Sequence, residues 1–442
     1  MTQEEAFDIL KLGYNVYLTG SAGSGKTFLL NKYIDYLEKN GVVVGITAST
    51  GIAATHINGL TIHSWSGMGI KDKLEEKDIN NLLLKPYLQQ RFLETRVLVI
   101  DEVSMLQASR LDMVNQICKI FKNSNAPFGG MQVILCGDFF QLPPVSKKDE
   151  DNSFVDKSKA WEEMDIKVCY LEEQYRQEDE KFLKLLNQIR ENNVSVDSLK
   201  LLMSRLNKPL NGNISPVKLY THNTNVDAIN DLELSRIKEK QYEFEMTSWG
   251  EQTLVDNLKK GCLAPEKLIL KKGAVVMFVK NNFNQGYVNG TLGKIIGFDE
   301  EGFPVVKTTS GLKAVAKPVS WKIEENDVLK AEINQVPLRL AWAITVHKSQ
   351  GMSLDLAEID LSKSFTCGMG YAALSRVRSL SSMKLMGINK MALQVDEEVL
   401  ESDFMLKKLS AQATTELRNL KPEEKLHNQN KFIENLRQIV YN

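Results

Sequence analysis

The octet Gly20–Thr27, with the sequence GSAGSGKT, has the residue types and spacing of a phosphate-binding loop. Its glycines let the backbone curl until N–H groups point inward at phosphate oxygens, and a following helix N-terminus adds a favourable dipole. Lys26 can then reach the β- and γ-phosphates, and Thr27 can ligate Mg²⁺. The alternative is a plain glycine-rich turn. It is disfavoured because a predicted strand precedes the octet and an amphipathic helix follows it.

Two adjacent carboxylates, Asp101 and Glu102, follow the apolar run 97–100. A carboxylate at the C-terminal end of a parallel strand lies beside the phosphate loop of a doubly wound sheet. We expect Asp101 to hold Mg²⁺ through water and Glu102 to polarise the attacking water. An isolated acidic pair is more often a solvated turn, but the preceding strand and the phosphate loop favour the catalytic interpretation.

A third polar segment, 137–144 (GDFFQLPP), also follows a predicted strand. Its Gln141 carries a neutral amide that can both donate and accept hydrogen bonds, which suits a sensor of the γ-phosphate. Without the other motifs this segment would be interpreted as a turn ended by prolines.

Short apolar runs alternate with helical patterns through the first 170 or so residues. The helical stretch 30–37 has apolar residues at spacings of three and four. This alternation predicts an α/β fold with a doubly wound parallel sheet. The predicted strands are Val16–Leu18, Val42–Ile46, Val97–Ile100, Gln132–Cys136 and Val168–Leu171.

The second half repeats this pattern with an interruption. Val217–Tyr220 predicts a strand that enters a second α/β unit, and the α/β pattern resumes from Ala331. Between them, residues 267–322 have short strands and glycine turns, which predict a small β-barrel. This segment carries nine lysines and three acidic residues. Its strands are predicted at Ala274–Val279, Lys294–Gly297, Val305–Lys307 and Ala314–Val315.

The composition is that of an ordinary globular enzyme. The chain has 442 residues, 43% of them hydrophobic, and a formal net charge of -1, so nucleic acid could bind only through local basic patches. Its five cysteines form no C-x-x-C pair, which favours a reducing cytoplasm over disulfides or structural zinc. Neither a leader sequence nor a membrane-spanning run is recognisable, and we expect no membrane partner.

Taken together, the motifs resemble superfamily-one DNA helicases of the RecD-like branch and, more narrowly, the Pif (petite integration frequency) family. The resemblance extends from residue 3 to about 380, and the segment 111–130 separates it from RecD itself. The matching segments are Gln3, Gly20–Thr27, Thr47–Ala54, Thr61–Ser64, Asp101–Met105, Gly137–Pro144, Tyr175–Gln177, Val288–Thr291, His347–Gly351 and Tyr371–Arg376.

This resemblance implies two RecA-like P-loop NTPase domains, with a small inserted β-barrel in the second. The first domain would span 1–172, with a short wedge insertion near 64–80. The second would span 173–390, with the basic insert at about 240–325, and a helical tail would occupy 391–442.

The resemblance also implies ATP- and Mg²⁺-dependent translocation from 5′ to 3′ on single-stranded DNA, with unwinding of duplexes, G-quadruplexes and RNA–DNA hybrids. The expected partners are single-stranded DNA and forked or structured DNA. Roles in DNA repair, recombination and telomere maintenance would follow. We expect a compact bacterial or phage-like enzyme that is monomeric when free.

Family motifs assign the nucleotide site. Gln3 would bond the adenine edge, and Arg176 and Arg376 would neutralise charge on the γ-phosphate, although most arginines in such a chain form surface ion pairs. The catalytic residues would be Lys26, Glu102, Gln141, Arg176 and Arg376. The nucleotide contacts would be Gln3, Gly20, Ala22, Gly23, Ser24, Gly25, Lys26, Thr27, Phe28 and Gly351.

The DNA path would use hydroxyls, backbone N–H groups and basic side chains facing phosphates. Lys348 adjoins His347, and we expect phosphates to attract both. Trp65, Phe139 and Tyr287 could stack on bases, although packing in the core is the commoner role for each. The expected DNA contacts are Thr50, Gly51, Ala53, Thr61, His63, Thr345, His347, Lys348 and Ser349.

Three other functions compete with the helicase. A P-loop switch or kinase would need no second α/β unit with arginine motifs and no stimulation by DNA. A DNA-binding module with a vestigial nucleotide site would have a degraded loop, whereas Lys26, Thr27, Asp101 and Glu102 are all present. A RecD-type subunit would unwind DNA only inside a nuclease complex.

Overall fold

The computed structural model describes residues 1–69, 73–144, 153–177, 179–210, 216–222, 226–282, 285–325 and 328–438. The chain divides into two compact units. The first comprises Met1–Phe139, Pro143–Tyr175 and Glu397–Asn442. The second comprises Phe140–Leu142 and Arg176–Asp396. No helix in the described part is long and apolar enough to cross a membrane.

The first unit is built on a six-stranded parallel sheet in the order β3-β2-β4-β5-β1-β6. Its central strands β1, β4 and β5 are buried along their whole length, as expected where helices cover both faces of a parallel sheet. The strands are β1 (Val16–Gly20), β2 (Val44–Ala48), β3 (Leu60–Thr61), β4 (Val97–Asp101), β5 (Gln132–Cys136) and β6 (Lys167–Leu171).

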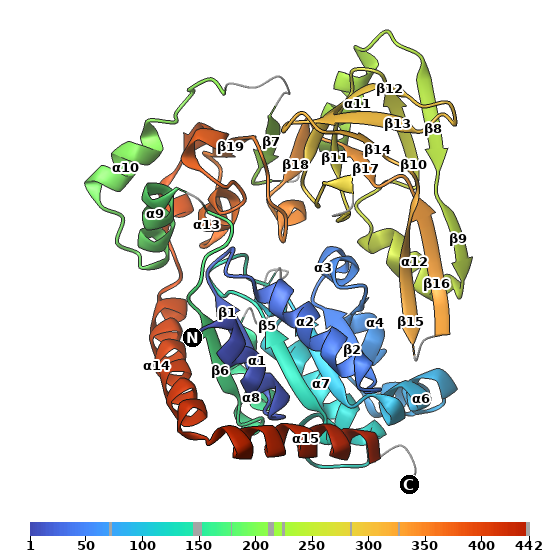
Figure 1. Cartoon of the computed structure of the whole chain (residues 1–442), viewed down its shortest axis with the longest axis vertical. Coiled ribbons are helices and arrows are strands. Elements are labelled where there is room, and N and C mark those ends of the chain that lie inside the picture. The colour runs from blue at the N-terminus through green and yellow to red at the C-terminus, as the bar shows by residue number, and fades with distance from the viewer. Residues whose placement is uncertain are drawn as a thin grey trace. The chain divides into compact units, whose positions relative to one another are not determined.

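Helices cover this sheet (Figure 1). In α2 (Lys26–Lys39), Leu30, Tyr33, Ile34 and Leu37 are buried at spacings of three and four, which places them on one face. The other helices that precede β6 are α1 (Gln3–Lys11), α3 (Gly51–His56), α4 (Ile62–Ser66), α5 (Glu76–Leu83), α6 (Pro86–Glu94), α7 (Ala108–Phe121) and α8 (Lys159–Glu163), with 3-10 turns at Val103–Met105, Pro127–Gly130 and Val155–Lys157.

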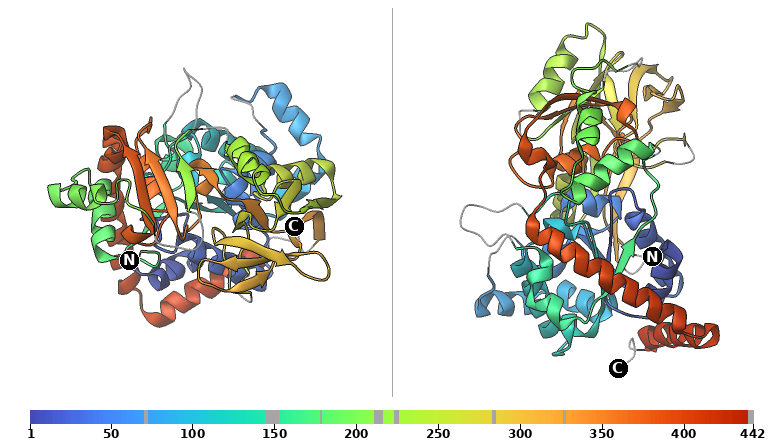
Figure 2. Two further views of the ribbon diagram at one scale, coloured as in Figure 1. Left: turned by 90° about the horizontal axis from the view of Figure 1, so that it is seen from above. Right: turned by 90° about the vertical axis from the view of Figure 1, so that its left-hand side faces the viewer.

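The C-terminal segment returns to the first unit as α14 (Glu397–Asn419) and α15 (Pro422–Gln438), the long red helices of Figure 2. Tyr170 in β6 donates its hydroxyl to Asp403 (2.8 Å) and its amide to Ser410 Oγ (3.1 Å). Lys425 pairs with Asp8 of α1 at 2.6 Å. The tail is therefore an integral layer of the first unit.

The second unit has a four-stranded parallel sheet in the order β18-β7-β19-β20. Its strands are β7 (Val217–Tyr220), β18 (Ala343–Thr345), β19 (Ala357–Leu361) and β20 (Met383–Ile388). Its helices are α9 (Glu180–Arg190), α10 (Val196–Met203), α11 (Val226–Ser235) and α13 (Met369–Leu374), with 3-10 turns at His347–Ser349, Leu380–Ser382 and Lys390–Leu393.

An antiparallel region is inserted between β7 and β18. It consists of a five-stranded sheet (β14-β13-β12-β11-β17), a three-stranded sheet (β15-β16-β9), a two-stranded antiparallel sheet (β10-β8) and α12 (Gln252–Gly261). The strands are β8 (Gln241–Glu245), β9 (Thr247–Gly250), β10 (Lys267–Lys271), β11 (Val275–Phe278), β12 (Leu292–Phe298), β13 (Pro304–Thr308), β14 (Lys313–Val315), β15 (Val319–Glu325), β16 (Val328–Gln335) and β17 (Leu338–Leu340). A separate apolar core, which includes Phe278, Ile295 and Val306, holds this region together.

The α/β fold with parallel sheets is confirmed, and each predicted strand begins and ends within about two residues of the observed one. The predicted small barrel is not confirmed, because the described strands of the insert pair into three separate sheets. The wedge predicted near 64–80 covers the end of α4 and the start of α5, and its residues 70–72 lie outside the described part.

Candidate nucleotide and DNA-binding sites

The octet Gly20–Thr27 connects β1 directly to α2. Gly20, Gly23 and Gly25 have φ values of 143°, 91° and 83°, in the region where a side chain is strained. At Gly25 the positive φ favours glycine, and the Gln3 side chain packs closely against this position. The loop therefore has the backbone curl that a phosphate cradle needs.

Two polar atoms inside this loop suit a phosphate group. Nζ of Lys26 donates to the carbonyls of Gly20 (2.9 Å) and Ser21 (3.1 Å), which holds the ammonium within the curl. Oγ of Ser24 is buried and has no hydrogen-bond partner within the described part of the chain. A buried hydroxyl without a partner is costly unless a ligand completes it, so the loop fits a phosphate-bearing nucleotide.

Residues from distant segments surround the loop. Nε2 of Gln3 donates to the Ser24 carbonyl at 3.3 Å, and the amide of Tyr175 donates to the Gly23 carbonyl at 3.0 Å. Gln174 donates from Nε2 to Oγ of Ser21. Gln3, assigned to the adenine edge, therefore lies beside the loop, together with segment 174–175.

Two aromatic rings on the same unit are open to solvent. The Phe28 and Tyr175 side chains are 66% and 62% exposed. Ala22, another predicted nucleotide contact, is buried. An exposed ring near a nucleotide loop can stack on a base.

The two predicted carboxylates lie at the end of β4, and only β5 separates β4 from β1 in the sheet. Asp101 is buried, and burial raises the pKa of its carboxyl above the usual range, although hydrogen bonds from the Cys136 thiol and the Glu102 amide, and the charge of Lys26, oppose this rise. A nearby cation favours the ionised carboxylate.

Glu102 has an unusual backbone conformation. Its φ of 52° and ψ of 43° are left-handed, which a residue with a Cβ rarely adopts. Its amide donates to Oδ1 of Asp101 at 2.8 Å, and its carbonyl accepts from Oγ of Ser49 at 2.6 Å. Backbone strain of this kind concentrates at functional sites, and the hydrogen bonds hold it in place.

In the second unit, three predicted catalytic residues meet at the C-terminal end of α13. Arg376, only 2% exposed, donates from Nη2 to Oε1 of Gln141 (3.2 Å) and to Oγ of Ser375 (2.9 Å). Arg176 donates from Nη1 to the Ser375 carbonyl at 3.2 Å, and Gln177 donates from Nε2 to the same carbonyl at 3.3 Å. Ser375 therefore links both predicted arginines.

Two further residues support this arginine cluster. Gly368 has a φ of 77°, and a Cβ there would lie 2.2 Å from the Gln141 carbonyl oxygen, so only glycine allows this approach. The Arg190 guanidinium lies 4.2 Å from the centroid of the Phe140 ring. Gln177 and Ser375 lie in segments that match the family, but no role was predicted for them, for Arg190 or for Cys136, because these roles depend on partners far away in the chain.

The DNA-contact residues expected in the first unit begin two short helices. Oγ1 of Thr50 accepts from the Ala53 amide, and Oγ1 of Thr61 accepts from the Ser64 amide, both at 3.2 Å. Gly51 starts α3, and Ala53 is buried within it. Burial and the neighbouring Arg110 lower the pKa of His63 to about 4. His63 is thus uncharged near neutral pH.

The DNA-contact residues expected in the second unit lie on the 3-10 turn His347–Ser349, which follows β18. Oγ1 of Thr345 accepts from the Lys348 amide at 3.2 Å, and the buried Ser349 hydroxyl donates to the Val346 carbonyl at 2.7 Å. Gly351 follows with a φ of 76°. Burial lowers the pKa of His347. The lowered pKa favours the neutral form of His347, and its contact with DNA stays a prediction.

The three aromatic residues weighed as base-stacking candidates are core residues. Trp65 packs edge-on against Phe92, Phe139 stacks on Tyr17, and Tyr287 stacks on Phe278. All three are at least 95% buried, so the packing role is confirmed for each.

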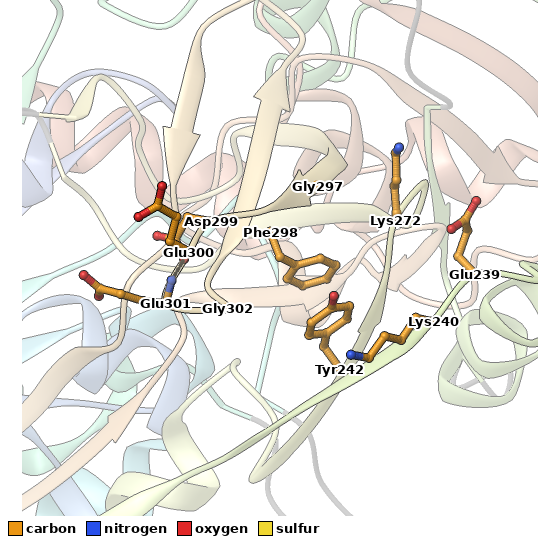
Figure 3. Close-up of a pocket in the computed structure, with 10 residues that line it drawn as sticks. All are labelled: Glu239, Lys240, Tyr242, Lys272, Gly297, Phe298, Asp299, Glu300, Glu301 and Gly302. Carbon is orange, nitrogen blue, oxygen red and sulfur yellow. Dashed lines mark hydrogen bonds between the residues drawn. The ribbon is translucent and has the colours of Figure 1, made fainter.

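A surface pocket of about 440 Å³ lies in the antiparallel insert (Figure 3). Tyr242 and Phe298 stack in it with their centroids 3.6 Å apart, beside the turn Asp299–Gly302. None of the predicted catalytic residues lines this pocket.

The fold and the site together define a P-loop nucleoside triphosphatase, with a lysine-bearing loop between β1 and α2 and a buried carboxylate at the end of β4. A family model described as PIF1-like helicase matches residues 2–199, and one described as the DNA helicase Pif1 2B domain matches residues 253–298. The ATP-dependent DNA helicase Pif1 of Psychrobacter sp. is 43% identical over 98% of this chain and 75% of that protein. The chain belongs to the Pif1 family of helicases.

Solved structures agree. Pif1 helicase from Candida albicans has a TM-score of 0.73 and 34% identity, covering 91% of this chain and 98% of that chain. Bacteroides sp. Pif1 in complex with ADP-AlF4 has a TM-score of 0.79 and 29% identity, covering 92% and 96%. Bacteroides Pif1 bound to single-stranded DNA has a TM-score of 0.64 and 28% identity, covering 92% and 97%.

Proposed function

We propose that this chain is an ATP-dependent DNA helicase that translocates from 5′ to 3′ on single-stranded DNA and unwinds duplexes. The observation that carries the proposal is the phosphate loop, where the Lys26 ammonium and the unpartnered Ser24 hydroxyl are held inside the curl. Further support comes from the membership in the Pif1 family and from the Bacteroides relative solved with single-stranded DNA.

At the phosphates, Lys26 and the loop amides bind the β- and γ-phosphates of ATP, and Gln3 bonds the adenine edge. Thr27 and Asp101 would hold Mg²⁺, Asp101 through water. When bound, Mg²⁺ neutralises charge on the phosphate oxygens. Glu102 orients and polarises the attacking water. The backbone amide of Glu102 donates to the Asp101 carboxylate, which holds the strained backbone of Glu102 beside Asp101.

The two predicted arginines would supply further positive charge at the γ-phosphate. We infer that Arg376 and Arg176 stabilise the γ-phosphoryl group as it transfers, and that Gln141, bonded to Arg376, senses its presence. These residues belong to the second unit and the phosphate loop to the first. Release of the γ-phosphate would therefore remove the group that these arginines stabilise, and this change would drive translocation.

The DNA strand would contact Thr50, Gly51, Ala53, Thr61 and His63 of the first unit. In the second unit it would contact Thr345, His347, Lys348 and Ser349. Lys348 contributes charge, while the neutral histidines contribute hydrogen bonds. Activity on G-quadruplexes and RNA–DNA hybrids belongs to the same proposal.

The free enzyme is proposed to be a monomer in a reducing cytoplasm, in keeping with five free thiols. One similar solved structure concerns DNA unwinding at forked duplex DNA by two coordinating Pif1 helicases. Sedimentation with and without a fork tests the monomer directly, and a dimer in the absence of DNA would contradict it.

Strand displacement on 5′-tailed and 3′-tailed duplexes, with and without ATP, tests the function. We expect ATP-dependent displacement of the 5′-tailed substrate and ATP hydrolysis stimulated by single-stranded DNA. Lys26→Ala should abolish both, whereas Lys32→Ala, an exposed lysine of the same helix, should not. Hydrolysis that DNA does not stimulate would favour a switch or kinase, and displacement only in a larger complex would favour a RecD-type subunit.

A further inference from the structure

Three lysines lie in one row across three neighbouring strands of the antiparallel insert. In the register of the sheet, Lys294 of β12 is directly opposite Lys307 of β13, and Lys307 is directly opposite Lys313 of β14. The three strands are adjacent in the sheet order, and Figure 1 shows them side by side. We call these three residues the lysine row.

The row faces outward. Neighbouring positions on the same strands, Ile295, Val306 and Ala314, are buried in the apolar core of the insert. Because side chains alternate between the two faces of a sheet, the lysines emerge on the opposite face, and all three are exposed.

Like charges directly opposite one another destabilise a sheet. No ion pair joins any of the three lysines to a carboxylate within the described residues. Two acidic residues near this sheet interact with other groups. Glu301 pairs with Lys317 at 2.9 Å, and Asp355 accepts from the Thr309 hydroxyl at 2.7 Å. The sheet therefore maintains an unfavourable, uncompensated positive row.

The acids of segment 267–322 are gathered at one end of the sheet. They are Asp299, Glu300 and Glu301, in the turn between β12 and β13. Figure 3 shows this turn beside the stacked rings of Phe298 and Tyr242. Within segment 267–322 the charges are thus separated along the strands, with the lysine row on one face and the acids in one turn.

We propose that the lysine row binds the phosphodiester backbone of duplex DNA. Neighbouring strands lie about 4.8 Å apart, so the row spans about 10 Å. One strand of a duplex presents a phosphate every 3.4 Å or so along the helix axis, which places about three phosphates beside three ammonium groups. This inference rests on the proposed helicase function and adds a duplex contact outside the nucleotide and single-strand motifs.

The test uses Lys294→Gln, Lys307→Gln and Lys313→Gln combined in the full chain. The matched control combines Lys408→Gln, Lys421→Gln and Lys431→Gln, three exposed tail lysines, which changes the net charge equally. Affinity for a blunt DNA duplex and for single-stranded DNA is measured against salt concentration. The melting temperature is measured as well.

Each duplex phosphate contact contributes about 0.9 to the slope of log affinity against log salt. The row variant should lose up to about 2.7 from the duplex slope and bind duplex on the order of 10-fold more weakly at 0.15 M salt. Lys→Arg at all three positions should restore both. The control should keep the wild-type slope. The row variant should melt no lower than wild type, since like-charge repulsion is removed.

An unchanged duplex slope, or a loss confined to single-stranded DNA, would overturn the row as a duplex site. Failure of the helicase proposal is distinguishable, because it would appear in the wild type and the tail control as hydrolysis that single-stranded DNA does not stimulate.

Discussion

Arg376 and Gln141 are joined by a hydrogen bond of 3.2 Å between Nη2 and Oε1, although 235 residues separate them in the chain. The bond ties the segment after β5 to the C-terminal end of α13. Arg376 also donates to Ser375 Oγ, and the Ser375 carbonyl accepts from Arg176. Hydrogen bonds thus connect Gln141, Ser375 and both arginines within the second unit.

Arg376→Ala should lower kcat by about 10³ or more, as expected for an arginine that stabilises phosphoryl transfer. Gln141→Ala should lower kcat less. If Gln141 acts through Arg376, the double variant should be no slower than Arg376→Ala alone. Steady-state ATP hydrolysis with saturating single-stranded DNA provides the comparison, and additive losses would show that the two residues act independently. Arg376→Lys, which keeps the charge, separates catalysis from a folding defect.

Glu102→Gln should bind ATP and DNA normally yet turn over at least about 10²-fold more slowly, because it removes the group that polarises water. Glu4→Gln, at an exposed position, should leave turnover unchanged. Wild-type turnover in Glu102→Gln would assign the base elsewhere.

Glu102→Gly should raise the melting temperature while abolishing hydrolysis. Glycine adopts the observed φ of 52° without strain. Relief of this backbone strain should stabilise the fold by on the order of 1 kcal/mol. A lowered melting temperature in this variant would show that the side chain stabilises the fold.

Ser24→Ala should raise KM for ATP roughly fivefold, equivalent to one hydrogen bond of about 1 kcal/mol, with no loss of melting temperature. The unpartnered hydroxyl is the physical reason, since alanine removes a buried polar atom that only the ligand satisfies. Ser158→Ala should lower the melting temperature and leave KM unchanged. Its side chain caps α8, so this variant loses about 1 kcal/mol of stability and keeps its KM. An unchanged KM for Ser24→Ala would place the phosphates elsewhere.

The stability of the first unit should fall as pH drops from 6.5 towards 4. Burial lowers the pKa of His56, and that of His63, to about 4. Between pH 6.5 and 4 the unfolded chain therefore binds protons at these rings that the folded chain does not bind. This contribution to the free energy of unfolding is present in full above pH 6.5. It is on the order of 1 kcal/mol for each ring, allowing for the partial exposure of the rings. His56→Gln should flatten the melting temperature below pH 6.5, whereas His427→Gln, on the exposed tail, should not.

Leu417→Ala in α14 should destabilise the first unit by about 2–3 kcal/mol, since the side chain is 7% exposed and belongs to its core. Leu409→Ala, 42% exposed in the same helix, should change stability by less than about 0.5 kcal/mol. Denaturant unfolding of both variants decides whether the tail is part of the folded core. Equal effects would contradict its integral role.

Local patterns explain why much of this molecule could be predicted. The strand at 132–136 and the phosphate loop are each set by a run of neighbouring residues, so chain order alone reveals them. The helix spacing in 30–37 is likewise local, and its apolar face packs as expected.

Features that depend on distant partners could not be predicted. The antiparallel strands of the insert were located, but whether they close into a barrel depends on pairings between separate segments, and these form three sheets. The Ser375 contacts and the Cys136–Asp101 bond also need the folded chain. The lowered pKa of His347 could not be predicted either, because it depends on burial, which the sequence does not display.

The return of α14 and α15 to the first unit has a practical consequence for anyone who cleaves this protein. A protease that cuts the backbone between Tyr175 and Arg176 would leave the C-terminal fragment anchored, because that fragment ends in helices held to β6 and α1 by Asp403, Ser410 and Lys425. Such a nicked molecule would migrate as two bands under denaturing conditions, yet elute from a sizing column as a single species.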